Sequence, residues 1–200
     1  MGTLERQYLE GIEAGTDEAG RGCLAGPVVA AAVVLPPDFS SPILNDSKKL
    51  TEKQRYALRE EIETVALAYG VAECSPEEID QWNILNASIT AMHRALDKLQ
   101  LDLDGIAVDG NRFKPYKNVP YHTHIKGDGR FLNIAAASIL AKTYRDDFMK
   151  KMALTFPQYA WEKNKGYPTA AHREAIKAYG PTPWHRKSFR LLPEQLQIEF

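Results

Sequence analysis

The chain has 200 residues, 44% of them hydrophobic and 26% charged, with a net charge of −1, a composition typical of a soluble globular protein. Its longest apolar run, residues 28–35, is too short to cross a bilayer, and its two cysteines exclude a disulfide framework. The N-terminal residues lack the apolar stretch of a signal peptide, so we expect a cytoplasmic protein that does not bind membranes.

The hydrophobic pattern predicts five strands and several helices within one layered α/β domain. In chain order we expect strands at residues 11–17 and 28–35, a helix at 51–66, a strand at 67–73, one or two helices between 76 and 99, strands at 105–109 and 121–126, and helices at 133–154 and 169–179. Thr51 and Gln54 form a capping box that begins the first helix. Two prolines make residues 180–189 a fixed surface segment.

Acidic residues lie where three of the predicted strands end. Asp17 and Glu18 precede a glycine, Asp109 precedes Gly110, and Asp128 lies between two glycines. Because side chains alternate across a strand, Asp17 and Glu18 can serve one site only if their strand ends there. Strand ends are where sites collect in open α/β sheets. Asp109-Gly110 alone is more typical of an ordinary turn.

Four carboxylates at one point favour a bound cation, because like charges repel unless a cation lies between them. Oxygen ligands prefer Mg²⁺ or Mn²⁺, and pairs of such ions assist in-line attack on phosphodiesters. His122 and His124 share one strand face but lack a third ligand nearby, so we do not expect a zinc site.

The glycine-rich loop after the first strand fits neither common nucleotide-binding motif. Gly20-Arg21-Gly22 departs from both the dinucleotide fingerprint and the P-loop. Exposed backbone N–H groups beside Arg21 suit contact with a sugar-phosphate backbone. Tyr167, between Gly166 and Pro168, either stacks on a sugar or base or covers an edge of the protein.

The charge is divided unevenly along the chain. Residues 1–110 contain 9 Lys/Arg and 19 Asp/Glu, whereas residues 111–200 contain 16 and 7. The basic half can bind a polyanion, although two solvated faces that attract each other explain the asymmetry equally well. If nucleic acid binds, the cations expected to face it are Lys48, Lys49, Lys126, Lys142, Lys165, Arg186 and Lys187.

Taken together, these segments resemble ribonuclease HII, the type 2 ribonuclease H of bacteria. The resemblance covers nearly the whole chain and is carried by GTDEAGRGCLAGPVVAAAVV, NDSKKLT, VDGN, KGDGRFLNIAAASILAKTYRD, NKGYPTAAH and HRKSF. It implies an RNase H-like α/β fold, with a five-stranded mixed sheet flanked by helices. The catalytic core would span about residues 1–155, and a C-terminal helical extension at about 156–200 would bind substrate.

The resemblance also implies an activity. The enzyme would be an endonuclease that hydrolyses the RNA strand of RNA/DNA hybrids, cutting 5′ of ribonucleotides embedded in or joined to DNA and leaving 3′-OH and 5′-phosphate ends. By resemblance, the four catalytic carboxylates, which hold two Mg²⁺ or Mn²⁺ ions, are Asp17, Glu18, Asp109 and Asp128. Gly20, Arg21 and Gly22 would read the 2′-OH, and Tyr167 would stack on the next deoxyribose. Further substrate-binding residues would be Lys48, Lys49, His185 and Arg186.

Two positions depart from the family pattern: Cys23 stands where Pro is usual and Asn133 where Ser is frequent, which affects the stiffness of the loop and the start of a helix. Alternative functions are a type 3 ribonuclease H, another nuclease or strand-transfer enzyme of this fold, or a non-catalytic hybrid-binding module. The tail Gln195–Phe200 resembles the short peptides that dock on sliding clamps, but packing on its own domain is the favoured alternative.

Overall fold

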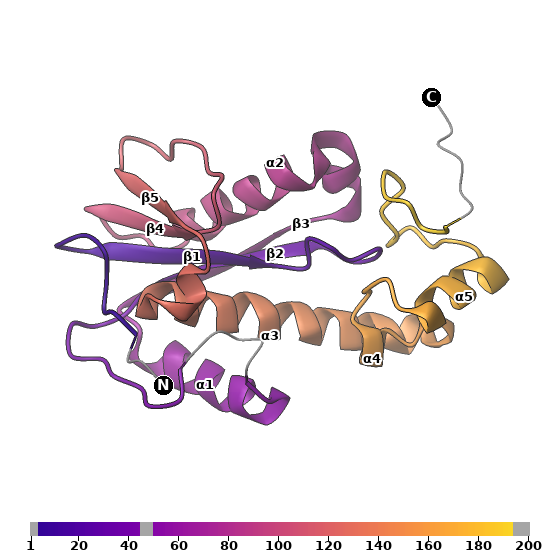
Figure 1. Cartoon of the computed structure of the whole chain (residues 1–200), viewed down its shortest axis with the longest axis horizontal. Helices are drawn as coiled ribbons and strands as arrows, with labels where there is room; N and C mark the ends of the chain where they lie inside the picture. Colours follow the sequence, from indigo (N-terminus) through magenta and orange to yellow (C-terminus); the bar gives the residue numbers. More distant parts are fainter. Residues whose placement is uncertain (1–3, 45–49, 194–200) are drawn as a thin grey trace.

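A five-stranded mixed sheet forms the centre of the structure, a computed structural model that describes residues 4–44 and 50–193 (Figure 1). The strand order is β3-β2-β1-β4-β5. The strands are β1 Glu13–Ala19, β2 Val28–Val34, β3 Ala68–Cys74, β4 Gly105–Asp109 and β5 Tyr121–His124. The pairs β1–β2 and β2–β3 are antiparallel, whereas β1–β4 and β4–β5 are parallel. The predicted five strands and mixed sheet are therefore confirmed.

The predicted helices are also present, with short additional turns. The α-helices are α1 Glu52–Val65, α2 Pro76–Asp97, α3 Leu132–Thr155, α4 Trp161–Asn164 and α5 Ala170–Tyr179, and the 3₁₀ turns are η2 Gly127–Gly129 and η3 Pro157–Tyr159. The capping box of Thr51 and Gln54 is confirmed at the start of α1. Asn83, with φ of 64°, interrupts α2, and its side chain accepts from the N–H groups of Leu85 and Asn86 to begin the second segment.

Helices cover both faces of the sheet. Alternate residues of β2 point to opposite faces and pack against different helices. Ala30 and Ala32 pack in the cluster that includes α2, whereas Ala31 and Val33 pack in the cluster formed with α1 and α3. Figure 1 shows α2 on one side of the sheet, and α3 with α1 on the other. No helix among the described residues is long and apolar enough to span a membrane.

Helix α3 lies close to β1 because small residues line their contact. An added Cβ at Gly15 would lie 2.2 Å from the carbonyl carbon of Asn133. The Asn133 side chain donates to the carbonyl of Glu13 (2.8 Å) and accepts from the N–H of Leu35 (3.0 Å). The asparagine that departs from the family pattern thus ties the start of α3 to β1 and to the end of β2.

Residues after α3 pack against the end of that helix and against the loop that follows β1 (Figure 1). Their buried cluster includes Trp161 of α4 and Ile176 of α5 together with Leu24 of the loop and Met149 of α3. The expectation that residues 180–189 form a surface segment is wrong in part, because His185 and Arg186 are buried there. Their side chains have hydrogen-bond partners within the protein, which removes the need for solvent.

The contact between β1 and α3 generates the first prediction. Replacing Gly15 with Ala inserts a methyl group against helix backbone, which cannot move aside as a side chain can. We expect Gly15→Ala to lower the free energy of unfolding by about 3 kcal/mol, which corresponds to about 6–12 °C in Tm for a domain of this size. Thermal denaturation followed by circular dichroism measures the change.

Gly129→Ala is the matched control, since nothing lies within 4 Å of a Cβ at that position. Equal Tm values for the two variants would contradict the close approach of α3 to β1.

Candidate active site

The parallel pairing of β1 with β4 brings the first acidic residues together. Thr16 is the register partner of Val108, which places Asp17 beside Asp109 at the end of β4. Strand β1 continues to Ala19, so the expectation that it ends at residue 17 is wrong. Asp17 and Glu18 nevertheless share a site, because β4 ends at Asp109 and leaves the last part of β1 without a neighbour on that side.

Burial and mutual repulsion dominate the electrostatics of this site. Burial raises the pKa of Asp17 well above its ordinary value, and the charges of Glu18 and Asp109 raise it further. Burial also raises the pKa of Glu18, although the adjacent Arg21 opposes this effect. The carboxylates therefore destabilise one another when no cation is present.

Glu18 has one oxygen engaged and one oxygen without a partner. Its Oε1 lies 3.1 Å from the guanidinium of Arg21. Its Oε2 is buried and has no hydrogen-bond partner within the described part of the chain. A buried carboxylate oxygen without a donor is costly, so this atom marks a position where a cation would be favourable.

Asp109 holds the turn that carries the fourth acidic residue. Its Oδ1 accepts from the N–H groups of Gly127 (2.7 Å) and Asp128 (3.4 Å). The turn begins at Lys126, which has a φ of 59°, and continues as η2. Asp128 is thereby fixed at the end of β4 with 3% of its surface exposed. All four predicted carboxylates thus lie around the same strand ends.

Within residues 4–44 and 50–193, no three acidic, histidine or cysteine side chains already surround one point as metal ligands. The directions of two side chains explain this: Glu18 is turned to Arg21, and Asp109 is turned to the η2 backbone. The donor set still fits a hard divalent ion, because it consists of carboxylate oxygens, one of them buried without a partner.

Two buried arginines are hydrogen-bonded to the backbone of the glycine loop that follows β1. Arg145 of α3 donates to the carbonyls of Pro27, Lys165 and Ala25 at 2.9–3.0 Å. Arg186 donates to the carbonyls of Gly26 and Arg21. Arg21 and Gly22 themselves are exposed. Because a Cβ at Gly22 would meet nothing within 4 Å, the loop backbone has open space above it.

Tyr167 lies against this loop and keeps part of its side chain in solvent. The residue is 41% exposed, and its side chain is hydrogen-bonded to that of Cys23 in the loop. The preceding Gly166 accepts from the N–H of Leu24 at 2.8 Å. The structure therefore places Tyr167 beside the glycine loop.

Several expected nucleic-acid contacts are not available at the surface. Arg186 and His185 have exposures of 0% and 1%, and Lys165 is also buried, so the expectation that these side chains face nucleic acid is wrong. Each of the three is hydrogen-bonded within the C-terminal region or to the glycine loop. Lys126 and Lys187 are exposed, as expected, whereas Lys48 and Lys49 lie outside the described residues.

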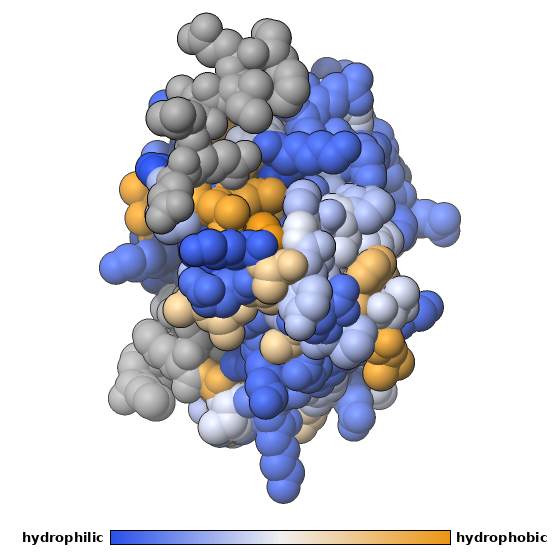
Figure 2. All heavy atoms as spheres, turned by 90° about the vertical axis from the view of Figure 1, so that its right-hand side faces the viewer, coloured by the Kyte–Doolittle hydropathy of each residue, from blue (hydrophilic) through white to orange (hydrophobic). Residues whose placement is uncertain are grey.

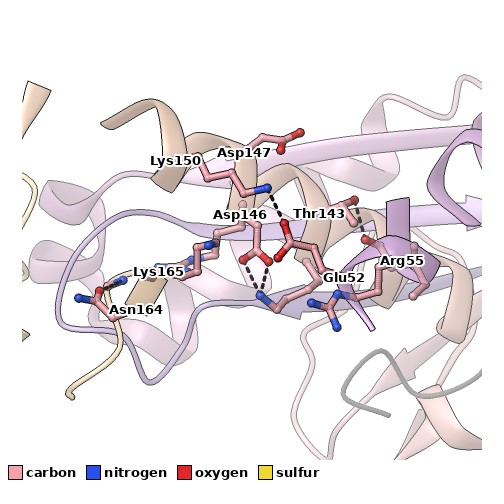
Figure 3. A network of polar contacts seen from close by, with 12 residues as sticks. Glu52, Arg55, Thr143, Asp146, Asp147, Lys150, Asn164 and Lys165 are labelled. Carbon is pink, nitrogen blue, oxygen red and sulfur yellow. Dashed lines mark hydrogen bonds and ion pairs between the residues drawn. The ribbon is translucent and has the colours of Figure 1, made fainter. Parts of the chain in front are cut away.

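Two of the cations of α3, Lys142 and Lys150, are in ion pairs. Nζ of Lys150 lies 2.7 Å from Oε1 of Glu52 of α1. Figure 3 shows Lys150 directed at Glu52, with Asp146 beside them. Asp146 also accepts from Lys142, one turn earlier in α3. The charge of Lys142 is therefore partly neutralised by a buried acid.

Figure 2 shows that hydrophilic side chains cover much of the face at the α4–α5 end, with smaller hydrophobic areas among them.

The two histidines of β5 pack against an aromatic ring. His122 and His124 both contact the ring of Tyr8, at centroid distances of 4.7 and 4.6 Å.

Sequence reasoning missed two residues that support the site. Arg145 and His172 are both buried, and both donate to backbone carbonyls of the loop or of the Tyr167 turn. The only sequence signal for Arg145 was its position among apolar residues of a predicted helix. That position could not reveal its carbonyl partners, which lie 20 to 120 residues away along the chain.

Comparison with known proteins gives a consistent result. Residues 14–192 match the family model of Ribonuclease HII. The chain is 64% identical over 187 residues to the Ribonuclease HII of Christiangramia forsetii, covering 94% of each chain. It resembles the RNase HII in a PCNA:RNase HII complex from Archaeoglobus fulgidus, with 26% identity, a TM-score of 0.75, and coverage of 92% of this chain and 98% of that one. Its fold is also similar to Bst-RNase HIII in complex with Mn²⁺, with 19% identity, a TM-score of 0.66, and coverage of 95% and 68%.

The repulsion within the site generates the second prediction. Asp17→Asn removes one buried charge and keeps an oxygen that can accept from the N–H of Glu18. In EDTA, we expect the free energy of unfolding to rise by about 1–2 kcal/mol, because one pKa unit of unfavourable interaction corresponds to about 1.4 kcal/mol. Chemical denaturation with a constant m-value measures this change.

The exposed residue Asp102 supplies the control, and Asp102→Asn should change the free energy of unfolding by less than about 0.5 kcal/mol. A loss of stability in Asp17→Asn under these conditions would show that the carboxylates do not repel one another.

Proposed function

The chain belongs to the ribonuclease HII family, and we propose that Asp17, Glu18, Asp109 and Asp128 form its catalytic site. It is a hydrolase, an endonuclease of the ribonuclease H type that acts on RNA/DNA hybrids. The family assignment disfavours a non-catalytic hybrid-binding module. The match of residues 14–192 to the Ribonuclease HII family model and the 64% identity to a curated Ribonuclease HII disfavour a type 3 enzyme.

One observation carries the assignment of the site. The β1–β4 register sets Asp17 beside Asp109, and the adjacent Glu18 has a buried oxygen without a partner in the described ranges. Such a cluster is unfavourable for folding, as its raised pKa values indicate. A functional site is the simplest reason for a fold to retain it.

Ribonucleases H depend on divalent metal ions, and we propose that this site binds two Mg²⁺ or Mn²⁺ ions. The residues that would hold them are Asp17, Glu18, Asp109 and Asp128. When bound, such ions supply an activated water and stabilise the leaving oxygen of a phosphodiester. Asp109 keeps Asp128 in place through the η2 backbone, and Arg21 orients Glu18 through its ion pair.

Recognition of the ribonucleotide is assigned to the glycine loop. The 2′-OH is the group that distinguishes RNA from DNA at one position. The backbone of Gly20, Arg21 and Gly22 can approach it closely, since the space above Gly22 is open. Cleavage on the 5′ side of that ribonucleotide, leaving 3′-OH and 5′-phosphate ends, follows from the family resemblance.

Tyr167 is assigned to the next sugar along the strand. Its partly exposed ring lies against the loop, where it can stack on a deoxyribose. Residues from about 156 onward would then be a substrate-binding extension of the catalytic core at residues 1–155. Support for this assignment comes from the buried cluster by which the extension packs on the end of α3 and on the glycine loop.

The third prediction compares three duplexes: one ribonucleotide in DNA, a continuous RNA/DNA hybrid, and DNA alone. We expect the enzyme to cut the first at least as efficiently as the second and to leave the third intact, because a missing hydroxyl leaves the loop groups without a partner. Tyr167→Ala should lower kcat/KM on the single-ribonucleotide duplex about tenfold more than on the hybrid. Asp109→Asn should remove most cleavage of both.

Tyr69→Ala is the matched control, since Tyr69 is 37% exposed but lies on the edge strand β3. Full activity of Asp109→Asn would refute the carboxylate assignment. Much faster cleavage of the hybrid than of the single-ribonucleotide duplex would refute the junction assignment alone.

The C-terminal peptide supplies a fourth prediction. Residues Gln195–Phe200 lie outside the described residues. Two observations support a role in clamp binding: their sequence resembles clamp-binding tails, and the related archaeal RNase HII was solved in complex with PCNA. We infer that this tail binds a sliding clamp. Deleting the last six residues should abolish retention on an immobilised bacterial sliding clamp and leave kcat/KM on the single-ribonucleotide duplex unchanged. Unchanged retention with a lower Tm would instead show that the tail packs on its own domain.

A further inference from the structure

Two buried histidines face each other in the C-terminal region. His172 lies in the first turn of α5, and His185 lies in the segment after that helix, with exposures of 0% and 1%. Their Nε2 atoms are 3.2 Å apart. Such a pair is stable only if one nitrogen donates and the other accepts, so the position of each proton is restricted.

The surrounding donors determine those positions. The indole N–H of Trp161 lies 3.0 Å from Nε2 of His172, and an indole nitrogen can only donate. Nε2 of His172 must therefore be an acceptor, and its proton must reside on Nδ1. The Nε2 of His185 carries a proton, because its Nδ1 is an acceptor, and this N–H shares the single lone pair of His172 Nε2 with the indole N–H. Nδ1 of His185 is the acceptor for the backbone N–H of Thr182, at 2.9 Å.

The proton on His172 is directed at Tyr167. Nδ1 of His172 lies 2.9 Å from the carbonyl oxygen of Tyr167, which also accepts from the N–H of Thr169 at 2.8 Å. The N–H of Tyr167 donates to the carbonyl of Asn164 at 2.9 Å. The backbone of Tyr167 is thereby held on both sides, and His172 provides the one bond from a side chain.

Both histidines are neutral in this arrangement. Burial lowers the pKa of His172, and burial together with His172 lowers the pKa of His185 to about 4. No carboxylate is hydrogen-bonded to either ring in the described ranges. A second proton on His172 would place an N–H against that of Trp161, so the network exists only with neutral rings.

We propose that His172, with its tautomer set by Trp161 and His185, is a positioning residue that fixes the ring of Tyr167 beside the glycine loop and so determines selectivity for the junction. This inference rests on the proposed role of Tyr167. Movement of the Tyr167 carbonyl would move its ring relative to Cys23, the loop residue to which its side chain is hydrogen-bonded.

Two substitutions of His172 separate its two functions. Asn places an amide N–H near the position of Nδ1 and keeps the bond to Tyr167, whereas Gln places an acceptor near Nε2 and keeps the bonds to Trp161 and His185. The measured quantity is kcat/KM on the single-ribonucleotide duplex divided by kcat/KM on the continuous hybrid. His172→Gln should lower this ratio about fivefold, the effect of one lost hydrogen bond, and His172→Asn should stay within about twofold of the parent.

A second measurement tests whether the effect passes through Tyr167. In a Tyr167→Ala background, His172→Gln should change the ratio by less than about twofold, because the ring is already absent. Equal losses in His172→Gln and His172→Asn, or a full loss that persists without the ring, would overturn the proposal. If Tyr167→Ala itself leaves the ratio unchanged, the proposed role of Tyr167 fails and the positioning role fails with it.

The network can also be tested in the unmodified protein, which avoids any variant that does not fold. Nitrogen-15 NMR of the imidazole rings at pH 7.5 should show His172 protonated on Nδ1 and His185 protonated on Nε2. The opposite tautomer for His172, or a charged ring in either residue, would overturn the proposal whatever the kinetics show.

Discussion

Two buried guanidinium groups hold the functional parts of this protein together. Arg145 and Arg186 direct their donors at carbonyls of the glycine loop and of Lys165, and neither has a carboxylate as its hydrogen-bond partner within the described residues. A buried charge is unfavourable unless it is well hydrogen-bonded. Displacement of the loop would remove the hydrogen-bond acceptors of both guanidinium groups and so raise the free energy of the folded state. Burial lowers the pKa of Arg186 to about 10, which still leaves it charged at neutral pH.

Helix α3 links this constraint to the acidic residues of the proposed catalytic site. At its start Asn133 is bonded to β1 and to the residue after β2, and further along Ser138 is hydrogen-bonded to Asp17. Two turns later Arg145 reaches the loop, and Met149 packs beside Gly26. One rigid helix therefore fixes the distance between the carboxylates and the loop, which suits a site that must position a strand relative to metal ligands.

The site combines an unfavourable charge cluster with a favourable scaffold. The carboxylates repel one another, and Glu18 retains a buried oxygen without a donor in the described ranges. The backbone N–H groups of η2 and the ion pair with Arg21 offset part of that repulsion. The substrate selectivity that we propose depends on a different region, the Tyr167 turn, which is held by buried histidines. In this proposal, catalysis and selectivity depend on separate interactions that meet at the glycine loop.

Local patterns in the sequence determined the presence of the five strands and the capping box at Thr51, because alternation and capping involve neighbours along the chain. They did not determine where the strands end, since β5 ends at His124 and Asp128 lies in η2. The resemblance of several separated motifs supplied the family and the proposed catalytic role of the four carboxylates. Only the tertiary structure showed that β1 extends to Ala19, that His185 and Arg186 are buried, and that His172 bonds to Tyr167. These features depend on partners distant in sequence, so no local pattern encodes whether a polar side chain meets solvent or a backbone carbonyl.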